Sequence, residues 1–226
     1  MILRHSHTEV SERQMKITVF GATGGVGTQL VEQGLKRGHS VTAVVRDAAR
    51  LTMRDPALRI FAVAGLDAPG ILAPAIGGSD AVLSAVGPRG RKDGPVASGS
   101  TRAVLSAMDT CGVDRLIAVS AMPVGPVPQG ESVVTRWLVR PALKAMLHDA
   151  YADLAEMEAQ LQRSGIAWTV VRPPKLVNEP LTGRYRMVLG ANVPRGSTIS
   201  RADVAHAMLD ALQRPQTIRQ AVGLAY

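Results

Sequence analysis

The fold is most directly predicted from residues Lys16-Ile-Thr-Val-Phe-Gly-Ala-Thr-Gly-Gly-Val-Gly27. The apolar first half of this stretch predicts a buried strand, and the glycines that follow predict a tight turn. Apolar residues then recur at helical spacing, and Gly38 is placed to end that helix. A second apolar strand is predicted over residues 41–46. The apolar helix positions are Val26, Leu30, Val31 and Leu35.

Three glycines of this stretch have separate physical roles. Gly21 lets the chain turn sharply off the strand, Gly24 lets the backbone approach a diphosphate, and Gly27 lets the helix pack closely on the sheet. The helix would then direct its unpaired amide groups and its positive dipole end at phosphate oxygens. This strand, turn, helix and strand together predict a dinucleotide site. The loop residues expected at the cofactor are Gly21, Ala22, Thr23, Gly24, Gly25, Val26 and Gly27.

The end of the second predicted strand indicates which dinucleotide is bound. In a NAD site an acidic residue there binds the ribose 2′-hydroxyl, whereas an arginine accommodates a 2′-phosphate. Arg46 holds this position, Asp47 follows it, and Arg50 lies one helical turn further on. We therefore expect NADP(H) to be favoured over NAD(H). The alternative is that Arg46 is only a solvated charge at the end of a strand.

Apolar strands and helices continue to alternate along the chain. This order is typical of a mostly parallel sheet covered by helices on both faces, so we expect a Rossmann-like, doubly wound α/β fold. Asp67 closes the third strand, where the adenine of a dinucleotide would lie. The further strands are predicted at residues 59–64, 80–86, 115–120 and 167–171. The further helices are predicted at residues 47–53, 68–76, 95–108 and 150–163, and Ser200 with Asp203 forms a capping box that begins one more.

The sequence predicts a single domain over residues 15–226. Residues 1–14 are polar and lack the apolar stretch of a secretion signal, so we expect them to be a disordered extension. Segments rich in proline and glycine leave the carboxyl ends of two strands, the edge where open α/β sheets bind ligands. We expect substrate loops at residues 122–149 and 172–199, which together form a small C-terminal substrate pocket.

Composition narrows the choice of partners. The net charge of +8 raises nucleic acid as a partner, but the charges are scattered and only 3% of the 226 residues are aromatic. A small anionic ligand explains this balance at least as well, so nucleic acid is not expected. No apolar run is long enough to span a bilayer, and no spacing of histidines and acids suggests a metal. Cys111 is the single cysteine, which excludes an intrachain disulfide and leads us to expect a cytoplasmic location.

Several sequence blocks resemble the atypical short-chain dehydrogenase/reductase group, in its NAD(P)H-binding, NmrA-like branch. The chain is most similar to the biliverdin-IXβ reductase/flavin reductase family. The blocks are Phe20-Gly-Ala-Thr-Gly-Gly-Val-Gly27, Val45-Arg-Asp47, Gly112-Val-Asp-Arg115, Val119-Ser-Ala121, Arg163-Ser-Gly165, Arg172-Pro-Pro174, Pro180-Leu-Thr-Gly-Arg-Tyr185 and Ile199-Ser-Arg-Ala-Asp203.

The resemblance implies NADPH-dependent reduction of a flat conjugated acceptor, such as a flavin, a bilin or a quinone-like compound. Ser120 would lie beside the nicotinamide at the tip of the fifth strand and orient the acceptor, which makes it the candidate catalytic residue. The alternative is that this serine only contacts the cofactor. The other residues that the resemblance places at the cofactor are Ser84, Ala85, Val86, Gly87, Ala121, Pro173 and Pro174.

One departure from the larger group bears on the chemistry. Standard short-chain dehydrogenases use a Tyr-x-x-x-Lys pair, in which lysine lowers the tyrosine pKa so that the hydroxyl can protonate a carbonyl oxygen. Here Tyr151 is followed four residues later by Ala155, so that pair is missing. A non-catalytic NADP(H) sensor of the NmrA-like type is therefore the alternative to a reductase. An isomerase or epimerase of sugar nucleotides is disfavoured, because such enzymes generally keep the pair.

Three residues are candidates for binding the acceptor. Met122 opens the first substrate loop, and Arg136 and Arg140 form a basic helical stripe with Lys144. Such a stripe could hold a carboxylate or phosphate of an anionic acceptor. An ordinary solvated helix face is the alternative, and the sequence leaves the oligomeric state open.

Overall fold

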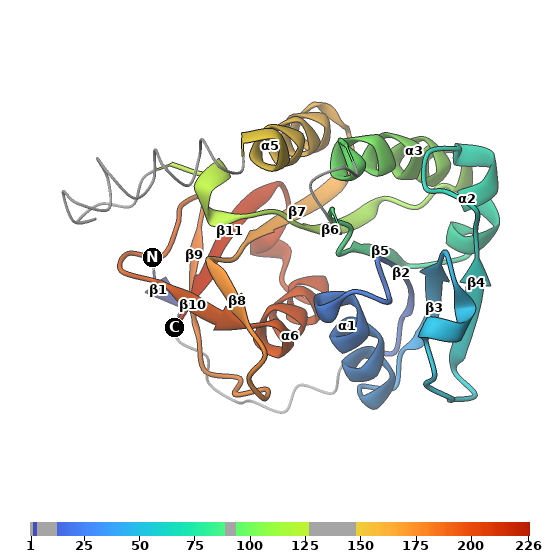
Figure 1. The fold of residues 1–226 in the computed structure, drawn as a ribbon, viewed down its shortest axis with the longest axis horizontal. Coiled ribbons are helices and arrows are strands. Elements are labelled where there is room, and N and C mark those ends of the chain that lie inside the picture. Colours follow the sequence, from blue (N-terminus) through green and yellow to red (C-terminus); the bar gives the residue numbers. More distant parts are fainter. Residues whose placement is uncertain (1, 4–12, 89–93, 127–147) are drawn as a thin grey trace.

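The computed structural model describes residues 2–3, 13–88, 94–126 and 148–226. Six parallel strands form the middle and one side of a large sheet, in the order β4-β3-β2-β5-β6-β7 (Figure 1). The chain winds outward in one direction from β2 to β4 and in the other direction from β5 to β7. The doubly wound fold expected from the sequence is therefore confirmed. The strands are β2 (Lys16–Phe20), β3 (Ser40–Val45), β4 (Leu58–Ala62), β5 (Ala81–Ser84), β6 (Arg115–Val119) and β7 (Ala167–Arg172).

Short C-terminal strands extend this sheet beyond β7. β11 (Gln220–Ala225) lies parallel to β7, and β9 (Arg186–Leu189) is antiparallel to β11. β8 (Lys175–Val177) and β10 (Thr198–Ser200) form a separate parallel pair. The loop expected at residues 172–199 instead contains β8, β9 and the first two residues of β10.

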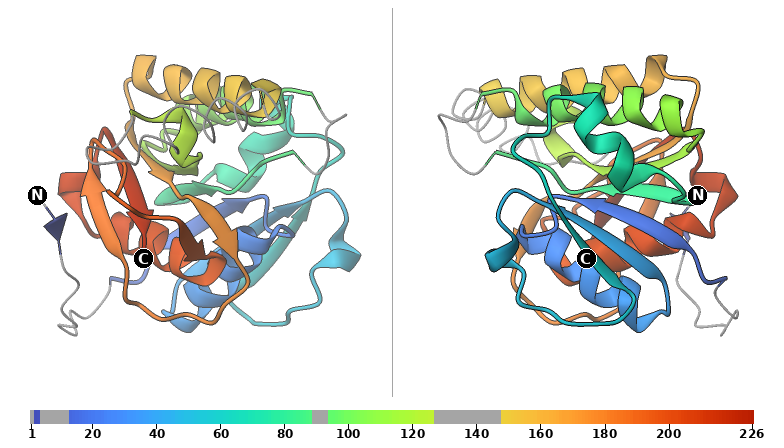
Figure 2. Two further views of the ribbon diagram at one scale, coloured as in Figure 1. Left: turned by 60° about the vertical axis from the view of Figure 1, so that its left-hand side comes forward. Right: turned by 90° about the vertical axis from the view of Figure 1, so that its right-hand side faces the viewer.

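Helices cover both faces of the sheet, as the three-layer views show (Figure 2). One face carries two helices that pack on each other, α1 (Gly25–Lys36) and α6 (Arg201–Leu212). The other carries α2 (Pro69–Ile76), α3 (Val96–Cys111) and α5 (His148–Arg163), with α3 between the other two. The predicted helix over residues 47–53 is wrong: only Ala48–Arg50 forms a short 3-10 turn, η1, because the Asp47 side chain caps the Ala49 amide and the chain is extended again at Leu51.

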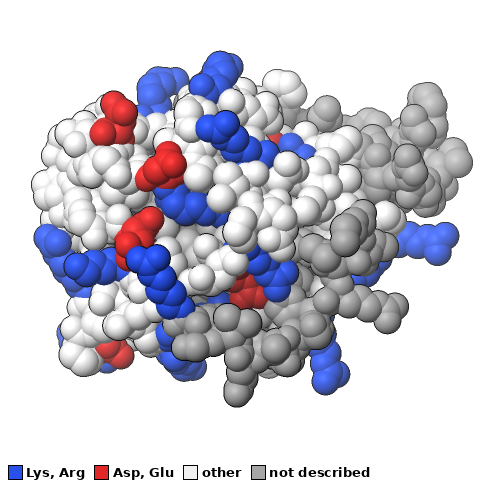
Figure 3. Space-filling model, turned by 180° about the vertical axis from the view of Figure 1, so that it is seen from behind, with Lys and Arg blue, Asp and Glu red and all other residues white. Residues whose placement is uncertain are grey.

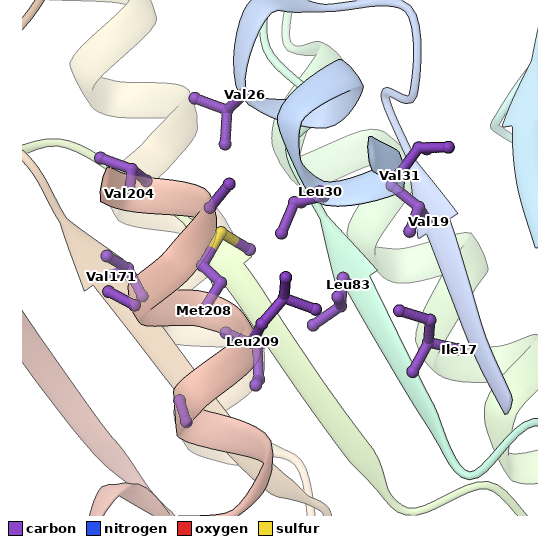
Figure 4. Packing of buried hydrophobic residues seen from close by; sticks show 14 of the residues in the cluster. Ile17, Val19, Val26, Leu30, Val31, Leu83, Val171, Val204, Met208 and Leu209 are labelled. Atoms are coloured by element: carbon purple, nitrogen blue, oxygen red, sulfur yellow. The ribbon is translucent and has the colours of Figure 1, made fainter. Parts of the chain in front are cut away.

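Each face of the sheet has its own apolar cluster. Leu30 of α1 and Met208 of α6 are fully buried against the strands, and Figure 4 shows them with Leu209 in the space between the two helices and the sheet. On the opposite face, Phe20 and Leu72 belong to the second cluster and are also fully buried. Because the central parallel strands are buried on both faces, their sequences are almost continuously apolar.

The N-terminal segment contributes one described strand. β1 (Ile2–Leu3) pairs antiparallel with β9 at the edge of the sheet. The extension expected to be disordered, residues 1–14, thus contains two residues with a strand partner. Its residues 1 and 4–12 lie outside the described part of the chain.

A buried carboxylate ties the C-terminal segments together. Asp203 is fully buried and accepts hydrogen bonds from the Thr182 hydroxyl at 2.9 Å and the Gly183 amide at 2.8 Å. The Tyr226 hydroxyl donates to it at 2.5 Å. The capping box is half confirmed, since the Asp203 amide does donate to Ser200 Oγ at 2.9 Å. The reciprocal bond is absent among the described residues, because the Ser200 amide donates to the Tyr226 hydroxyl instead, at 3.0 Å.

We predict that Asp203→Asn lowers the free energy of unfolding by about 2–3 kcal/mol at neutral pH, because it replaces a carboxylate that accepts several buried hydrogen bonds. Burial raises the pKa of Asp203, but the bonds from Tyr226, Gly183, Thr182 and Ser200 outweigh it and leave the pKa below its ordinary value. A lowered folded-state pKa gives stability that is present above the unfolded-state pKa and is lost as the pH falls through the folded-state value.

Urea unfolding of both proteins between neutral pH and pH ~3 tests this prediction. The difference between wild type and Asp203→Asn should shrink below a pH of about 4. Asp109→Asn, at an exposed position of α3, serves as the matched control and should change little at any pH. A difference that stays constant down to acid pH would contradict the prediction.

Candidate cofactor site

A cavity of about 710 Å³ opens at the carboxyl ends of the parallel strands. It spans the point between β2 and β5 where the winding direction changes, which is where open α/β sheets bind ligands. The residues that line it are Gly21, Thr23, Gly24, Gly25, Val26, Val44, Val45, Arg46, Arg50, Ala64, Gly65, Leu66, Ala85, Val86, Gly87, Pro88, Val96, Val119, Ser120, Leu154, Leu176 and Arg201.

The glycine turn fits between β5 and α1 with no space for side chains. Gly21 has a φ of +74°, and a Cβ placed on it would lie 2.5 Å from the Ala85 carbonyl oxygen. A Cβ on Gly27 would lie 2.0 Å from the Gly21 carbonyl oxygen. The Gly24 amide closes the turn by donating to that same oxygen at 2.9 Å. Glycine at positions 21 and 27 is therefore a packing requirement, as the sequence indicated.

The N-terminus of α1 faces the cavity with its amide groups uncapped. Its N-cap residue is Gly24, no side chain caps the helix, and its first turn holds no acidic residue. The first amides of a helix lack intrahelical partners and carry the positive end of its dipole. This end of α1 can therefore hold a diphosphate, as the sequence predicted.

Two arginines that follow β3 line the cavity. Arg46 comes directly after β3, and Arg50 ends η1; both line the cavity and are exposed. Neither forms an ion pair with any acid in the described ranges. The Asp47 carboxylate instead accepts the Ala49 amide at 3.0 Å. Both guanidinium groups are thus available to an anionic ligand.

Ser120 lies in the cavity wall at the end of β6. Its residue is 5% exposed, and its hydroxyl oxygen is buried without a hydrogen-bond partner among the described residues. The Ser120 amide donates to the Val171 carbonyl at 2.8 Å, which fixes the backbone position. Because a buried hydroxyl without a partner costs free energy, this one is suited to bonding a ligand.

Three apolar side chains belong to the same cavity wall as Ser120. Val119 comes from β6, Leu154 from α5 and Leu176 from β8, and all three line the cavity. Tyr151 of α5 does not line it, and burial raises the pKa of its hydroxyl. A flat apolar molecule with few polar groups would match this end of the cavity better than a sugar.

Two buried groups fasten the segment after β6 and the end of β7. Asn192 Nδ2 donates to the carbonyl oxygens of Met122 at 2.9 Å and Pro126 at 2.7 Å. Arg172, at the end of β7, forms a buried ion pair with Glu158 of α5 that includes an Nε to Oε1 bond of 3.0 Å. These contacts fix the segment after β6 and the end of β7 within the fold.

Not every residue expected at the site lines the cavity. Ala22 and Ser84 are buried, and Gly27 packs on the glycine turn. The Met122 amide donates to the Pro173 carbonyl at 2.8 Å, a backbone contact that joins two predicted segments behind the cavity wall. Arg136 and Arg140 lie outside the described residues. Those that do not line the cavity are Ala22, Gly27, Asp67, Ser84, Ala121, Met122, Pro173 and Pro174.

Several residues of the cavity wall are not among those expected from the sequence. The sequence places Arg201 only at a helix start and Leu176 only in a loop, yet both line the cavity. The spacing of Arg50 after Arg46 is a local signal that places Arg50 at the cavity. Arg201 reaches α1 only through long-range folding, which has no local sequence signal. Gly65 and Leu66, beside the expected Asp67, take the place of that aspartate in the lining.

A glycine turn before an uncapped helix, at the switch point of a parallel sheet, defines a Rossmann-type dinucleotide-binding domain. Residues 21–215 match the model of the NAD(P)H-binding family, and the chain belongs to this family of NAD(P)H-binding oxidoreductases. The resemblance to atypical short-chain dehydrogenases/reductases of the NmrA-like branch is confirmed.

Curated relatives and solved structures agree with this family. An uncharacterised chloroplastic protein of Arabidopsis thaliana is 32% identical over 95% of this chain and 78% of its own length. The NAD(P)H azoreductase of Xenophilus azovorans is 28% identical over 91% of this chain and 66% of its own length.

Two solved structures have the same fold. ChuY, an anaerobilin reductase from Escherichia coli O157:H7, superposes with a TM-score of 0.75 at 24% identity, over 93% of this chain and 96% of that one. A short-chain dehydrogenase/reductase from Veillonella parvula in complex with NADP has a TM-score of 0.78 at 20% identity, over 94% of this chain and 95% of that one.

The described residues show neither a metal cluster nor a membrane helix. They contain no group of three or more His, Cys, Asp or Glu side chains that could hold a metal ion, and no helix among them is long and apolar enough to cross a bilayer. On the face shown in Figure 3, basic and acidic side chains are interspersed.

We predict that Gly27→Ala disrupts the site by forcing α1 away from the glycine turn. The added methyl group meets backbone atoms, which cannot rotate aside, so the free energy of unfolding should fall by about 1–3 kcal/mol. NADPH affinity should fall with it. Urea unfolding and fluorescence titration with NADPH measure both effects.

Gly99→Ala is the matched control, because a Cβ at Gly99 meets nothing within 4 Å and the residue lies inside α3. It should be neutral or stabilise the protein by up to about 1 kcal/mol. Equal stability and NADPH affinity of Gly27→Ala and wild type would contradict the packing role of Gly27.

Proposed function

We propose that the protein is an NADPH-dependent reductase that transfers hydride to a flat conjugated acceptor such as a flavin, a bilin or a quinone-like compound. One observation carries the proposal: a cavity joins the uncapped start of α1, with Arg46 and Arg50, to the buried hydroxyl of Ser120. Within the described part of the chain the two arginines have no acidic partner and the hydroxyl has no hydrogen-bond partner. The end at α1 and the arginines suits phosphates. The end at Ser120 suits a nicotinamide with an apolar acceptor packed against it.

The residues fit NADPH at the phosphate end. The amides at the start of α1 would bind the diphosphate, and Arg46 with Arg50 would bind the 2′-phosphate, which NADH lacks. Leu66 and Gly65, which line the cavity after β4, would lie beside the adenine. We therefore propose NADPH as the preferred cofactor.

A bound NADPH would supply the hydride. Ser120 would hydrogen-bond the nicotinamide or the acceptor and so fix the distance and angle between them. Val119, Leu154 and Leu176 would exclude water from the apolar end and hold a planar ring system.

The proposed acceptors need no acid from the protein. Burial raises the pKa of Tyr151, the opposite of what a neighbouring lysine would do, and Ala155 stands at the position of that lysine. A conjugated acceptor spreads the negative charge of its reduced form, so its proton can come from water. The names azoreductase and anaerobilin reductase, carried by two related proteins, support acceptors with conjugated double bonds.

A redox sensor that binds NADP(H) without turnover is the second candidate function. The observation in its favour is the same substitution of the Tyr-x-x-x-Lys pair by Tyr151 and Ala155. A sensor should discriminate between NADPH and NADP⁺ and should not consume NADPH with any acceptor, whereas the proposed reductase requires turnover.

We predict that the purified protein oxidises NADPH in the presence of a flavin, a biliverdin, an azo dye or a quinone, followed by the loss of NADPH absorbance. Ser120→Ala should lower kcat about tenfold, the value of one neutral hydrogen bond, with the Kd for NADPH changed little. Ser106→Ala, at an exposed position of α3, is the control and should keep full activity. Absence of turnover across this panel, despite NADPH binding, would overturn the reductase and favour the sensor.

We predict that replacing both Arg46 and Arg50 by methionine weakens NADPH binding by about tenfold or more and leaves NADH binding unchanged, because only NADPH carries the 2′-phosphate. Arg54→Met is the control, since Arg54 is exposed nearby but does not line the cavity. Isothermal titration with NADPH and NADH measures the affinities of the wild type and both variants. Equal affinity of the wild-type protein for NADPH and NADH would refute the assignment.

A further inference from the structure

Arg201 reaches the glycine turn from the far end of the sequence. The parallel pairing of β10 with β8 sets Ser200 opposite Val177. Arg201, the first residue of α6, is therefore next to Asn178, and its Nη1 donates to Asn178 Oδ1 at 2.7 Å. This bond fixes the direction of the side chain.

The Arg201 side chain crosses the first residue of α1. A Cβ placed on Gly25 would lie 2.5 Å from Arg201 Cδ and 2.8 Å from its Nε. Any residue larger than glycine at position 25 would displace the Arg201 side chain. Arg201 also lines the cavity, so its half-buried side chain lies between the start of α1 and the cavity.

The charge of Arg201 has no acidic partner among the described residues. Two other enclosed arginines have one, since Arg37 pairs with Asp210 at 2.8 Å and Arg172 pairs with Glu158. Enclosed Arg115 has no ion pair either, but its guanidinium donates to the carbonyl oxygens of Ala167 and Ala211. A guanidinium has five N–H donors, and Asn178 takes only one from Arg201. The first turn of α1 beside it is also without acid. Two sources of positive potential therefore meet at one point of the cavity.

We propose that Arg201 binds the diphosphate of the cofactor, across from the first-turn amides of α1. The inference rests on the proposed function only for the presence of a dinucleotide. Arg201 and the pair Arg46 and Arg50 then have different targets. Arg201 acts on the diphosphate, which NADPH, NADH and ADP share, whereas Arg46 and Arg50 act on the 2′-phosphate of NADPH and of adenosine 2′-monophosphate.

This division of targets gives a test that uses binding alone. Affinities of the full-length protein for NADPH, NADH, ADP and adenosine 2′-monophosphate are measured by calorimetry, with displacement of NADPH for the weaker ligands. Arg201→Met should weaken NADPH, NADH and ADP by about tenfold or more and leave adenosine 2′-monophosphate within twofold of wild type. The Arg46 and Arg50 double variant should weaken NADPH and adenosine 2′-monophosphate and leave NADH and ADP within twofold of wild type.

Two further variants separate binding from folding. Arg201→Lys keeps the charge and should recover part of the lost affinity for ADP. Arg184→Met, at an exposed position away from the cavity, should leave all four affinities unchanged. Thermal unfolding without ligand shows that each variant is folded before its affinities are compared.

Unchanged affinity of Arg201→Met for ADP and NADH would overturn the proposal. An equal loss for all four ligands would also overturn it, because it would mean a distorted site rather than a lost diphosphate contact. Neither result depends on turnover, so a protein that binds nucleotides in the proposed way but reduces no acceptor would refute the reductase and leave this inference standing.

Discussion

The contact between Gly27 and the carbonyl group of Gly21 is the constraint on which the site depends. It presses the first turn of α1 against the glycine turn, and the turn itself is pressed against Ala85 after β5. With no side chains at these positions, the helix starts directly at the carboxyl ends of the strands. Its uncapped amides are therefore at the cavity instead of several ångströms behind it. The contribution of α1 to the positive potential of the phosphate end follows from this packing, and the arginines of the cavity wall add to it.

The start of α6 connects the cofactor half of the molecule with its C-terminal portion. Asp203 collects hydrogen bonds from the segment at Thr182 and Gly183 and from the C-terminal Tyr226. Arg201, on the same turn, extends in the other direction, to Gly25 and Asn178. The acid holds the short C-terminal segments in place, and the arginine is thereby held over α1. Two residues of one helix turn thus have different roles: Asp203 stabilises the fold, and Arg201 faces the cavity.

The central sheet and the glycine turn could be predicted from the sequence because their signals are local. Continuous apolar runs indicate buried parallel strands, and glycine spacing indicates the turn. The C-terminal strands could not be predicted in this way: β8 and β10 have three residues each, and their pairing joins segments more than twenty residues apart. The residues of the cavity likewise divide into those with a local sequence signal and those without one. Arg46 follows a recognisable strand, whereas Arg201 and Leu176 reach the cavity only through long-range packing.

The distribution of arginines relates the strongly basic composition to the site. Arg37, Arg163, Arg172 and Arg214 each have a carboxylate partner within the described part of the chain. Arg46, Arg50 and Arg201, which line the cavity, have none there, and neither do exposed arginines such as Arg54 and Arg184, which do not line it. A folded protein gains little by gathering unpaired cations around a concave surface, because they repel one another. Their cost is offset once an anion with several phosphates binds between them, and so the charge excess around the cavity is best understood as part of the site.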